Sequence, residues 1–263
     1  MTDQLASYAP LISSIAAILN AIAWPAVAAW FLFIHRLKVS NLFTILGNKL
    51  TSAKKLKIGQ FELEDVLEEG VINAREQIGD SEMPKSIPKT QLQAAANLKE
   101  RVSTTELPES SVLEAVRNQI YDLASEYESV RSQMPSGHMR TRRMNEIAAG
   151  MRTLALAGLP LRTQLTRSDS IGKRLAAICM LQVEPRPRYF RWLIERVKSE
   201  TQPFVFYQAS VAILELLERK FYVNADVARS EISDAIRFIS SFPGGQPDQN
   251  TLDVLKEALS LVR

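Results

Sequence analysis

The chain has 263 residues, of which 46% are hydrophobic and 23% are charged, and its net charge is +3. This balance is typical of a folded protein and excludes a disordered chain, while one cysteine and two histidines exclude a zinc site of Cys and His ligands. The sequence contains no Walker-type glycine loop, no G-x-S-x-G and no H-E-x-x-H. We therefore expect no enzyme, no catalytic residue, no metal and no cofactor.

The first predicted element is a membrane-spanning helix. Ala9–Ile34 is a run of 26 residues without a formal charge, and about 20 apolar residues suffice to cross the hydrocarbon core of a bilayer. The main alternative is a cleaved signal peptide, which would begin with basic residues and have a shorter apolar core. The residues predicted to anchor the helix are aromatic side chains and one helix-kinking proline: Trp24, Pro25, Trp30 and Phe31.

The span also carries residues suited to a helix–helix interface within the membrane. Small side chains allow close backbone approach, and an amide can form a hydrogen bond between helices. The residues concerned are Ala16, Asn20 and Ala28. A single anchor tolerates the same residues, so a homo-oligomer formed through the span and an unpaired helix are both compatible with the sequence.

The distribution of charge predicts the orientation of the span. Residues 1–10 carry only Asp3, whereas basic residues follow the span closely: Arg36, Lys38, Lys49, Lys54, Lys55 and Lys57. Because positive residues stay on the cytoplasmic side, we expect the N-terminus outside the cell and the remainder in the cytoplasm. The same basic residues can contact anionic headgroups, so the lipid bilayer is the first expected partner.

Composition divides the chain into four regions. Residues 1–35 form the tail and the span, and residues 36–78 form a basic juxtamembrane segment with a short strand pair near 56–64. Residues 79–110, which contain Pro84, Pro88 and Pro108, form the predicted linker, with a helix over 91–102 as an alternative within it. Residues 111–263 form the soluble helical domain.

Part of the N-terminal half resembles a bacterial membrane module. The pair Trp24-Pro25, then Arg36, then the stretch KIGQFELE over residues 57–64, are similar to a single-span module with a K-x-G-x-F-E-x-E element. The resemblance covers residues 20–70. It implies attachment to the bacterial inner membrane as a single-pass protein and implies little chemistry.

The second half of the chain is predicted to be entirely helical, so the fold class is all-α apart from the strand pair. Apolar residues recur at helical spacing between Pro, Gly and Asn breaks. A weak repeat relates Ala176-Ala177-Ile178 to Ala209-Ser210-Val211 at an offset of 33 residues, which favours a HEAT-like α-solenoid over an irregular bundle. The predicted helices are Val112–Met134, Met139–Leu156, Ser170–Gln182, Arg188–Lys198, Pro203–Lys220, Ala225–Ser240 and Asn250–Val262.

A second resemblance covers residues 135–218. The stretches PSGHMRTRRMNEIAAGMRTLA, SIGKRLAAICMLQ, YFRWLIERV and PFVFYQAS are similar to a helical domain of bacterial conflict and signalling proteins. In that family the domain is joined to a variable effector or sensor part. The resemblance implies a setting in antiphage defence or signalling and does not imply an activity.

Basic residues gather between residues 138 and 174, where Glu146 and Asp169 are the only acids. Arginine forms bidentate hydrogen bonds with anions, so this bias predicts a surface for an anion or an acidic partner. A solvated helix face is the alternative interpretation. The candidate residues are Arg140, Arg142, Arg143, Arg152, Lys173 and Arg174.

Two functions follow from the sequence. The first is a membrane-anchored, non-enzymatic effector or adaptor whose helical domain binds a protein partner or a signal. The second is a passive membrane-tethered scaffold for protein interactions, in which the anchor only localises the domain. Nucleic acid is not expected as a partner of either.

Overall fold

A computed structural model of the chain describes residues 59–78, 85–220, 224–241 and 248–262. The chain divides into two compact units, Met1–Lys57 and Ile58–Arg263, and every described residue belongs to the second. The predicted span, with Ala16, Asn20 and Ala28 and the anchor residues Trp24 to Phe31, lies outside the described residues. None of the described helices is long and apolar enough to cross a membrane.

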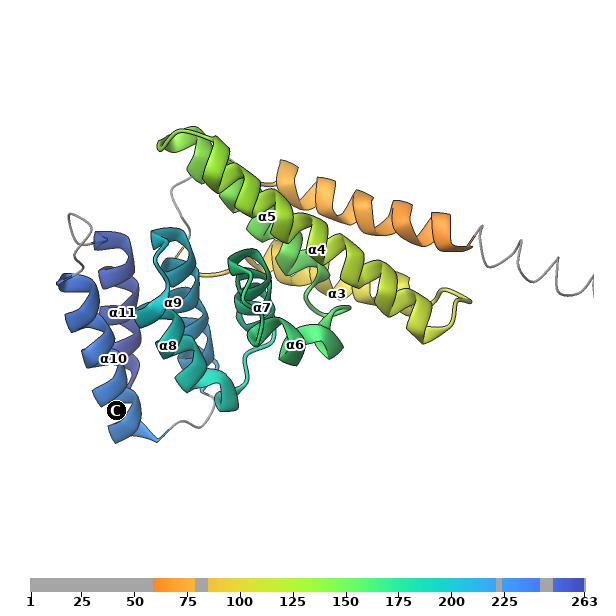
Figure 1. The fold of residues 1–263 in the computed structure, drawn as a ribbon. Coiled ribbons are helices and arrows are strands. Elements are labelled where there is room, and N and C mark those ends of the chain that lie inside the picture. Colours follow the sequence, from red (N-terminus) through yellow and green to blue (C-terminus); the bar gives the residue numbers. More distant parts are fainter. Residues whose placement is uncertain (1–58, 79–84, 221–223, 242–247, 263) are drawn as a thin grey trace, which may run out of the picture. The chain divides into compact units, whose positions relative to one another are not determined.

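Every regular element of the described residues is helical, which confirms the all-α class (Figure 1). Residues 59–76 are helical and precede α3. The longer helices that follow are α3 (Lys89–Ser103), α4 (Glu109–Gln133), α5 (His138–Leu154), α7 (Ile171–Val183), α8 (Phe190–Ser199), α9 (Pro203–Glu218), α10 (Ala225–Ser240) and α11 (Gln249–Leu261). Two 3-10 turns and one short helix complete the order: η1 (Leu159–Leu161), α6 (Arg162–Thr166) and η2 (Pro187–Tyr189).

The helices pack as successive pairs, as in a helical repeat. α5, α7, α9 and α11 form one row, since each packs against the next, and α3 extends this row by packing against α5. α8 packs against α9, and α10 packs against α11, so each of these two helices pairs with a member of the row. α8 and α10 also pack against each other. The repeat seen in the sequence lies on α7 and α9, which are neighbours in this row.

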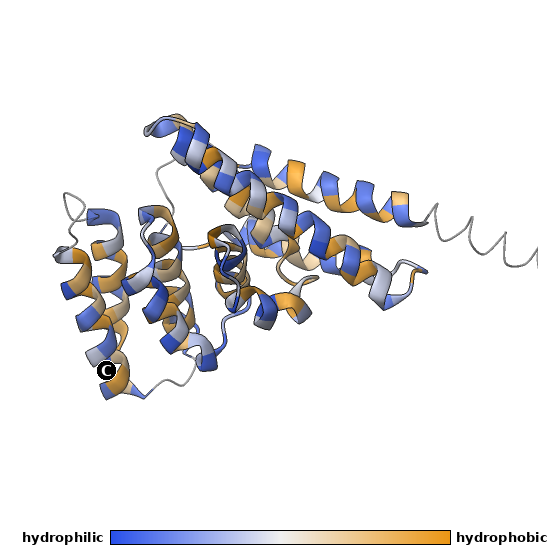
Figure 2. Cartoon of the chain, viewed as in Figure 1, coloured by the Kyte–Doolittle hydropathy of each residue, from blue (hydrophilic) through white to orange (hydrophobic). Residues whose placement is uncertain are grey.

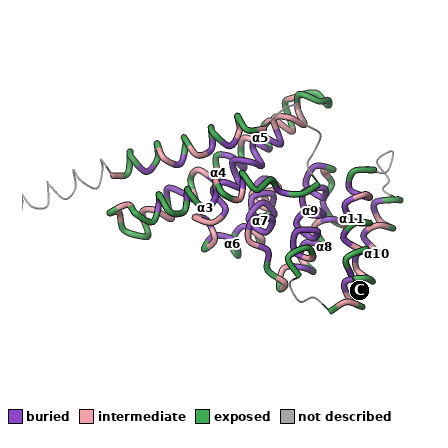
Figure 3. Tube along the Cα trace, turned by 180° about the vertical axis from the view of Figure 1, so that it is seen from behind, coloured by how far each residue is buried: buried purple, intermediate pink, exposed green. Residues whose placement is uncertain are grey.

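The core follows the central row of helices. α9 is buried along its whole length from Phe204 to Leu216, and α7 is buried from Leu175 to Val183 (Figure 3). Both stretches are buried on all sides and mostly apolar, as expected for helices with neighbours all round. α8 is amphipathic instead, because only Phe190, Leu193, Ile194 and Val197 are buried.

The strand pair predicted near 56–64 is wrong for residues 59–64, which are helical. The buried residues of this segment, Leu63, Leu67, Val71 and Ala74, recur every three or four positions and not at alternate positions. Phe61, on another side of this helix, is 65% exposed. Apolar and polar bands therefore alternate along this helix (Figure 2).

α3 lies within the predicted linker and is packed into the domain. It buries Gln91, Ala95, Leu98 and Val102, and Leu98 lies against Gly70 of the preceding helix. Just before α3, the backbone N–H of Ile87 donates a buried 2.8 Å hydrogen bond to Oε1 of Glu215 in α9. This hydrogen bond attaches the segment before α3 to α9.

Candidate functional site

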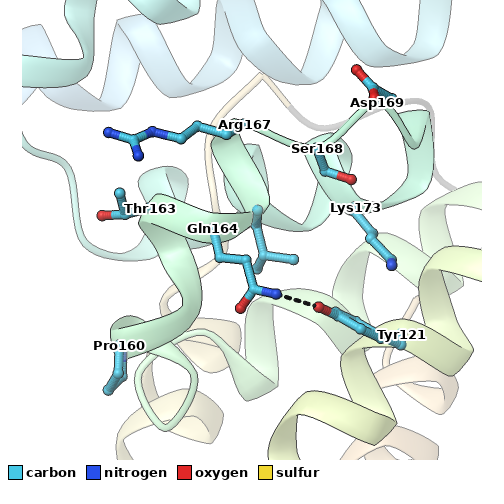
Figure 4. Close-up of a pocket in the computed structure, with 9 residues that line it drawn as sticks. Tyr121, Pro160, Thr163, Gln164, Arg167, Ser168, Asp169 and Lys173 are labelled. Carbon is cyan, nitrogen blue, oxygen red and sulfur yellow. Dashed lines mark hydrogen bonds between the residues drawn. The ribbon is translucent and has the colours of Figure 1, made fainter.

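A hollow opens beside α6, the shortest α-helix of the described residues. It lies among residues of α4, of η1, of α6 and of the start of α7. The hollow has a volume of about 730 Å³ (Figure 4) and is lined by Tyr121, Pro160, Thr163, Gln164, Leu165, Arg167, Ser168, Asp169 and Lys173.

Two cations lie in this hollow in different surroundings. Nζ of Lys173 stands 3.8 Å from the centre of the Tyr121 ring, in a cation–π contact. Gln164 Nε2 donates a 3.0 Å hydrogen bond to the hydroxyl of Tyr121, as Figure 4 shows. Arg167 is exposed, and its guanidinium makes no hydrogen bond or ion pair with any described residue. One cation is therefore fixed by an aromatic ring while the other is available to a binding partner.

A second, more basic pocket is lined by the start of α6 and by residues at η2. It has a volume of about 390 Å³ and is lined by Arg162, Arg186, Pro187 and Arg188. Arg186 forms a 2.5 Å ion pair with Glu184, and Nη1 of Arg162 donates to the backbone carbonyl of Glu184 at 3.3 Å. Three guanidiniums thus surround a pocket in which Glu184 supplies one carboxylate.

Tyr189 holds two of these arginines in place. The centre of its ring lies 5.1 Å from Cζ of Arg162 and 4.9 Å from Cζ of Arg188, and its hydroxyl is 3.2 Å from Oγ1 of Thr163. Burial alone would raise the pKa of Tyr189. The hydrogen bond with Thr163 and the two nearby guanidiniums outweigh burial, so the pKa of Tyr189 is lowered. The shift reports a positive electrostatic potential around the ring.

Three predicted residues at the start of α5 make contacts within the protein. Arg143 forms ion pairs with Glu126 at 2.6 Å and with Glu146 at 2.9 Å, and the pair with Glu146 raises its pKa. Arg142 also pairs with Glu146, at 3.3 Å. Arg140 donates a 3.1 Å hydrogen bond to the backbone carbonyl of Met134. These arginines hold α5 to α4 and to the turn between them.

Arg174 supports the loop that precedes α7. Its guanidinium donates to both carboxylate oxygens of Glu200, at 2.6 and 2.9 Å. It also donates to the backbone carbonyls of Ser168 and Asp169. The hydrogen bond to Glu200 raises the pKa of Arg174, even though burial opposes it. Lys173, its neighbour, is the one predicted residue that lines the hollow beside α6.

Arg152 lies in the core, away from the other predicted residues. It is 2% exposed, and burial lowers the pKa of its guanidinium. Its nitrogens donate to the side-chain carbonyls of three glutamines on α3, α7 and α9: Gln91 at 2.6 Å, Gln182 at 3.0 Å and Gln208 at 3.3 Å. The structure therefore does not bring the six predicted residues together on one surface.

The most basic pocket contains residues outside the predicted set, namely Arg162, Arg186 and Arg188, together with the adjacent Tyr189. The sequence signal for it is the alternation of basic and aromatic residues from Arg186 to Trp192. Within this stretch Phe190 belongs to the core, at 3% exposed. Tyr189 is half-buried, and its ring contacts both the buried Arg162 and the exposed Arg188.

The described residues hold no group of three or more His, Cys, Asp or Glu side chains placed to bind a metal ion. Cys179 is a buried free thiol, and burial raises its pKa to about 11. In comparisons with known proteins, no family model matches the chain, and neither a curated protein nor a solved structure matches it.

Proposed function

We propose that this protein is a membrane-anchored, non-enzymatic adaptor whose helical domain binds an acidic protein partner. The observation that carries the proposal is the hollow beside α6, where Arg167 is exposed and makes no contact with an acid among the described residues. A HEAT-like repeat suits such a role, because stacked helix pairs present an extended surface for binding. The bacterial defence or signalling setting implied by the resemblance is part of the proposal.

The anchor in this proposal is Ala9–Ile34, with the helical domain on the cytoplasmic side. Support comes from its 26 uncharged residues and the basic residues after it. The test compares full-length protein with the double variant Ala17→Arg, Ala21→Arg, since each arginine at the centre of a span costs about 2.5–3.5 kcal/mol. When membranes are treated with alkaline carbonate, we expect the wild-type protein to stay in the membrane fraction and the variant to be released into the supernatant.

The matched control places the same two charges beyond the span, as Ser40→Arg, Asn41→Arg. This control should remain with the membrane like the wild type. Release of the wild type by carbonate would contradict the anchor. A control variant released as readily as the double span variant would show that any added charge disturbs the protein.

Binding of the partner is tested by site-specific photo-crosslinking in cells. A photoreactive residue replaces Gln164, which is exposed in the hollow, or Ser230, which is exposed on α10. We expect a discrete adduct from position 164 alone, and we expect Arg167→Glu to abolish it by repelling an acidic surface. An adduct that forms equally from position 230, or that survives the charge reversal, would contradict the proposal.

A further inference from the structure

Arg162 is a buried cation without a carboxylate partner among the described residues. It is 8% exposed, and its contacts are with neutral groups. The backbone carbonyl of Glu184 accepts its hydrogen bond at 3.3 Å, and the Tyr189 side chain lies against its guanidinium. Removing a guanidinium from water is costly unless a counter-charge or several acceptors compensate. No carboxylate among the described residues therefore neutralises the positive charge of Arg162.

Arg186 and Arg188 add to this charge at the same pocket. The carboxylate of Glu184 neutralises one of the three guanidiniums through its pair with Arg186. Two positive charges remain around a space of about 390 Å³. Arg188 is exposed, and its contacts within the described part of the chain are with Tyr189.

The donors of the pocket are held ready by Tyr189. One ring contacts the guanidiniums of both Arg162 and Arg188, and the hydrogen bond between its hydroxyl and Thr163 ties η2 to α6. Side chains that are ordered before binding lose less conformational entropy when a ligand arrives. The pocket thus combines excess positive charge with guanidiniums that are already held by Tyr189.

We propose that the pocket of Arg162, Arg186 and Arg188 binds a phosphate group. A phosphate monoester carries about two negative charges near neutral pH and presents three terminal oxygens, which matches two uncompensated guanidiniums. A carboxylate carries one charge and two oxygens, so it would leave one guanidinium unpaired. The pocket is larger than a phosphate group and leaves room for the adjoining part of the ligand. This inference goes beyond the adaptor function and does not depend on it.

The test uses full-length protein in phosphatidylcholine nanodiscs and inorganic phosphate as the probe. Isothermal titration calorimetry should show saturable binding to the wild type, measured at constant ionic strength so that general screening is equal. Arg162→Met and Arg188→Gln should each weaken binding about tenfold, the effect of losing a charge-assisted hydrogen bond. The control is Arg191→Gln, an exposed arginine on α8 outside the pocket, which should bind phosphate like the wild type.

A second arm distinguishes a lipid headgroup from a soluble phosphate ester. In nanodiscs that contain phosphatidic acid, a headgroup that occupies the pocket would compete with inorganic phosphate and weaken its apparent binding. Unchanged binding would assign the pocket to soluble phosphate compounds. Absence of saturable binding to the wild type, or an equal loss with Arg191→Gln, would overturn the proposal. Because Arg188 is exposed, its variant keeps the test decisive even if Arg162→Met fails to fold.

Discussion

Two arginines on either side of the turn after α5 show how the same side chain serves two purposes. Arg152 and Arg162 are both buried, and neither forms an ion pair with a carboxylate among the described residues. Arg152 donates to three glutamine carbonyls held by three different helices. Arg162 donates to one backbone carbonyl at the wall of an open pocket. The number of fixed acceptors separates a structural arginine from one that can bind a ligand.

The cluster around Arg152 also explains how α3 is attached to the domain. Gln91 brings α3 to the guanidinium, while Gln182 also donates to the side-chain carbonyl of Gln208, at 2.8 Å. A buried polar network of this kind stabilises one packing of the helices, because any shift leaves donors or acceptors unpaired. Arg152 should therefore determine stability, whereas Arg162 should determine binding.

The largest effect is expected from Arg152→Met. The variant leaves buried acceptors on Gln91 and Gln182 without their donor, at a cost of about 1–3 kcal/mol for each. We expect the free energy of unfolding to fall by about 2–4 kcal/mol, measured by urea denaturation of the full chain followed by far-UV circular dichroism. Unchanged stability would mean that the desolvation of Arg152 already cancels its hydrogen bonds.

The sequence predicts much of the fold, but it does not predict the different surroundings of Arg152 and Arg162. α10 covers Ala225–Ser240 as predicted, because its apolar residues recur at helical spacing and Asn224 caps its first turn through the N–H of Val227. The strand prediction failed over residues 59–64, because a few apolar residues around a glycine fit a short strand and a helix alike. Local pattern therefore predicts helices best where the apolar stripe is long.

The candidate site was harder to predict, because its residues meet only in three dimensions. Arg152 lies in a basic segment and was grouped with surface arginines, yet its acceptors are 61, 30 and 56 residues away. Polar Gln182 and Gln208 within apolar helices were a usable sign of a buried network. No such sign marked the approach of Thr163 to Tyr189, which depends on the short α6.

The second effect tests whether α3 is held through Gln91. Gln91→Met keeps the side-chain volume but removes the 2.6 Å hydrogen bond to Arg152, and a bond to a charged group contributes about 1.5–3 kcal/mol. We expect faster hydrogen exchange of the α3 amides, measured by mass spectrometry. Gln93→Met, at an exposed position of the same helix, is the control. Equal exchange in the two variants would assign the attachment of α3 to apolar packing alone.

The third effect concerns alkaline pH and Cys179, which lies in the same core. Burial raises the pKa of its thiol from 9.0 to about 11, so between these values the unfolded chain loses a proton that the folded chain keeps. The unfolded state then binds fewer protons, and stability falls as the pH rises through this window, by about 1–2 kcal/mol. Urea denaturation at pH values within the window measures the loss.

Cys179→Ala separates this contribution from other groups that titrate at high pH. Burial also raises the pKa of Tyr207, to about 12, and this contribution persists in the variant. We expect the variant to show a shallower loss of stability between pH 9 and 11 than the wild type. Identical slopes would place the pH dependence elsewhere.

The smallest effect on stability is expected from Arg162→Met, and it completes the comparison. The variant loses one long, 3.3 Å hydrogen bond from the guanidinium to a backbone carbonyl and the cation–π contact with Tyr189, each of which contributes about 1 kcal/mol. It also removes a positive charge that lies near Arg186 and Arg188. The weaker repulsion among these guanidiniums offsets part of the lost stability. We expect a net loss of about 1 kcal/mol, under the denaturation conditions used for Arg152→Met. A loss as large as that of Arg152→Met would make Arg162 structural and remove the distinction drawn between the two arginines.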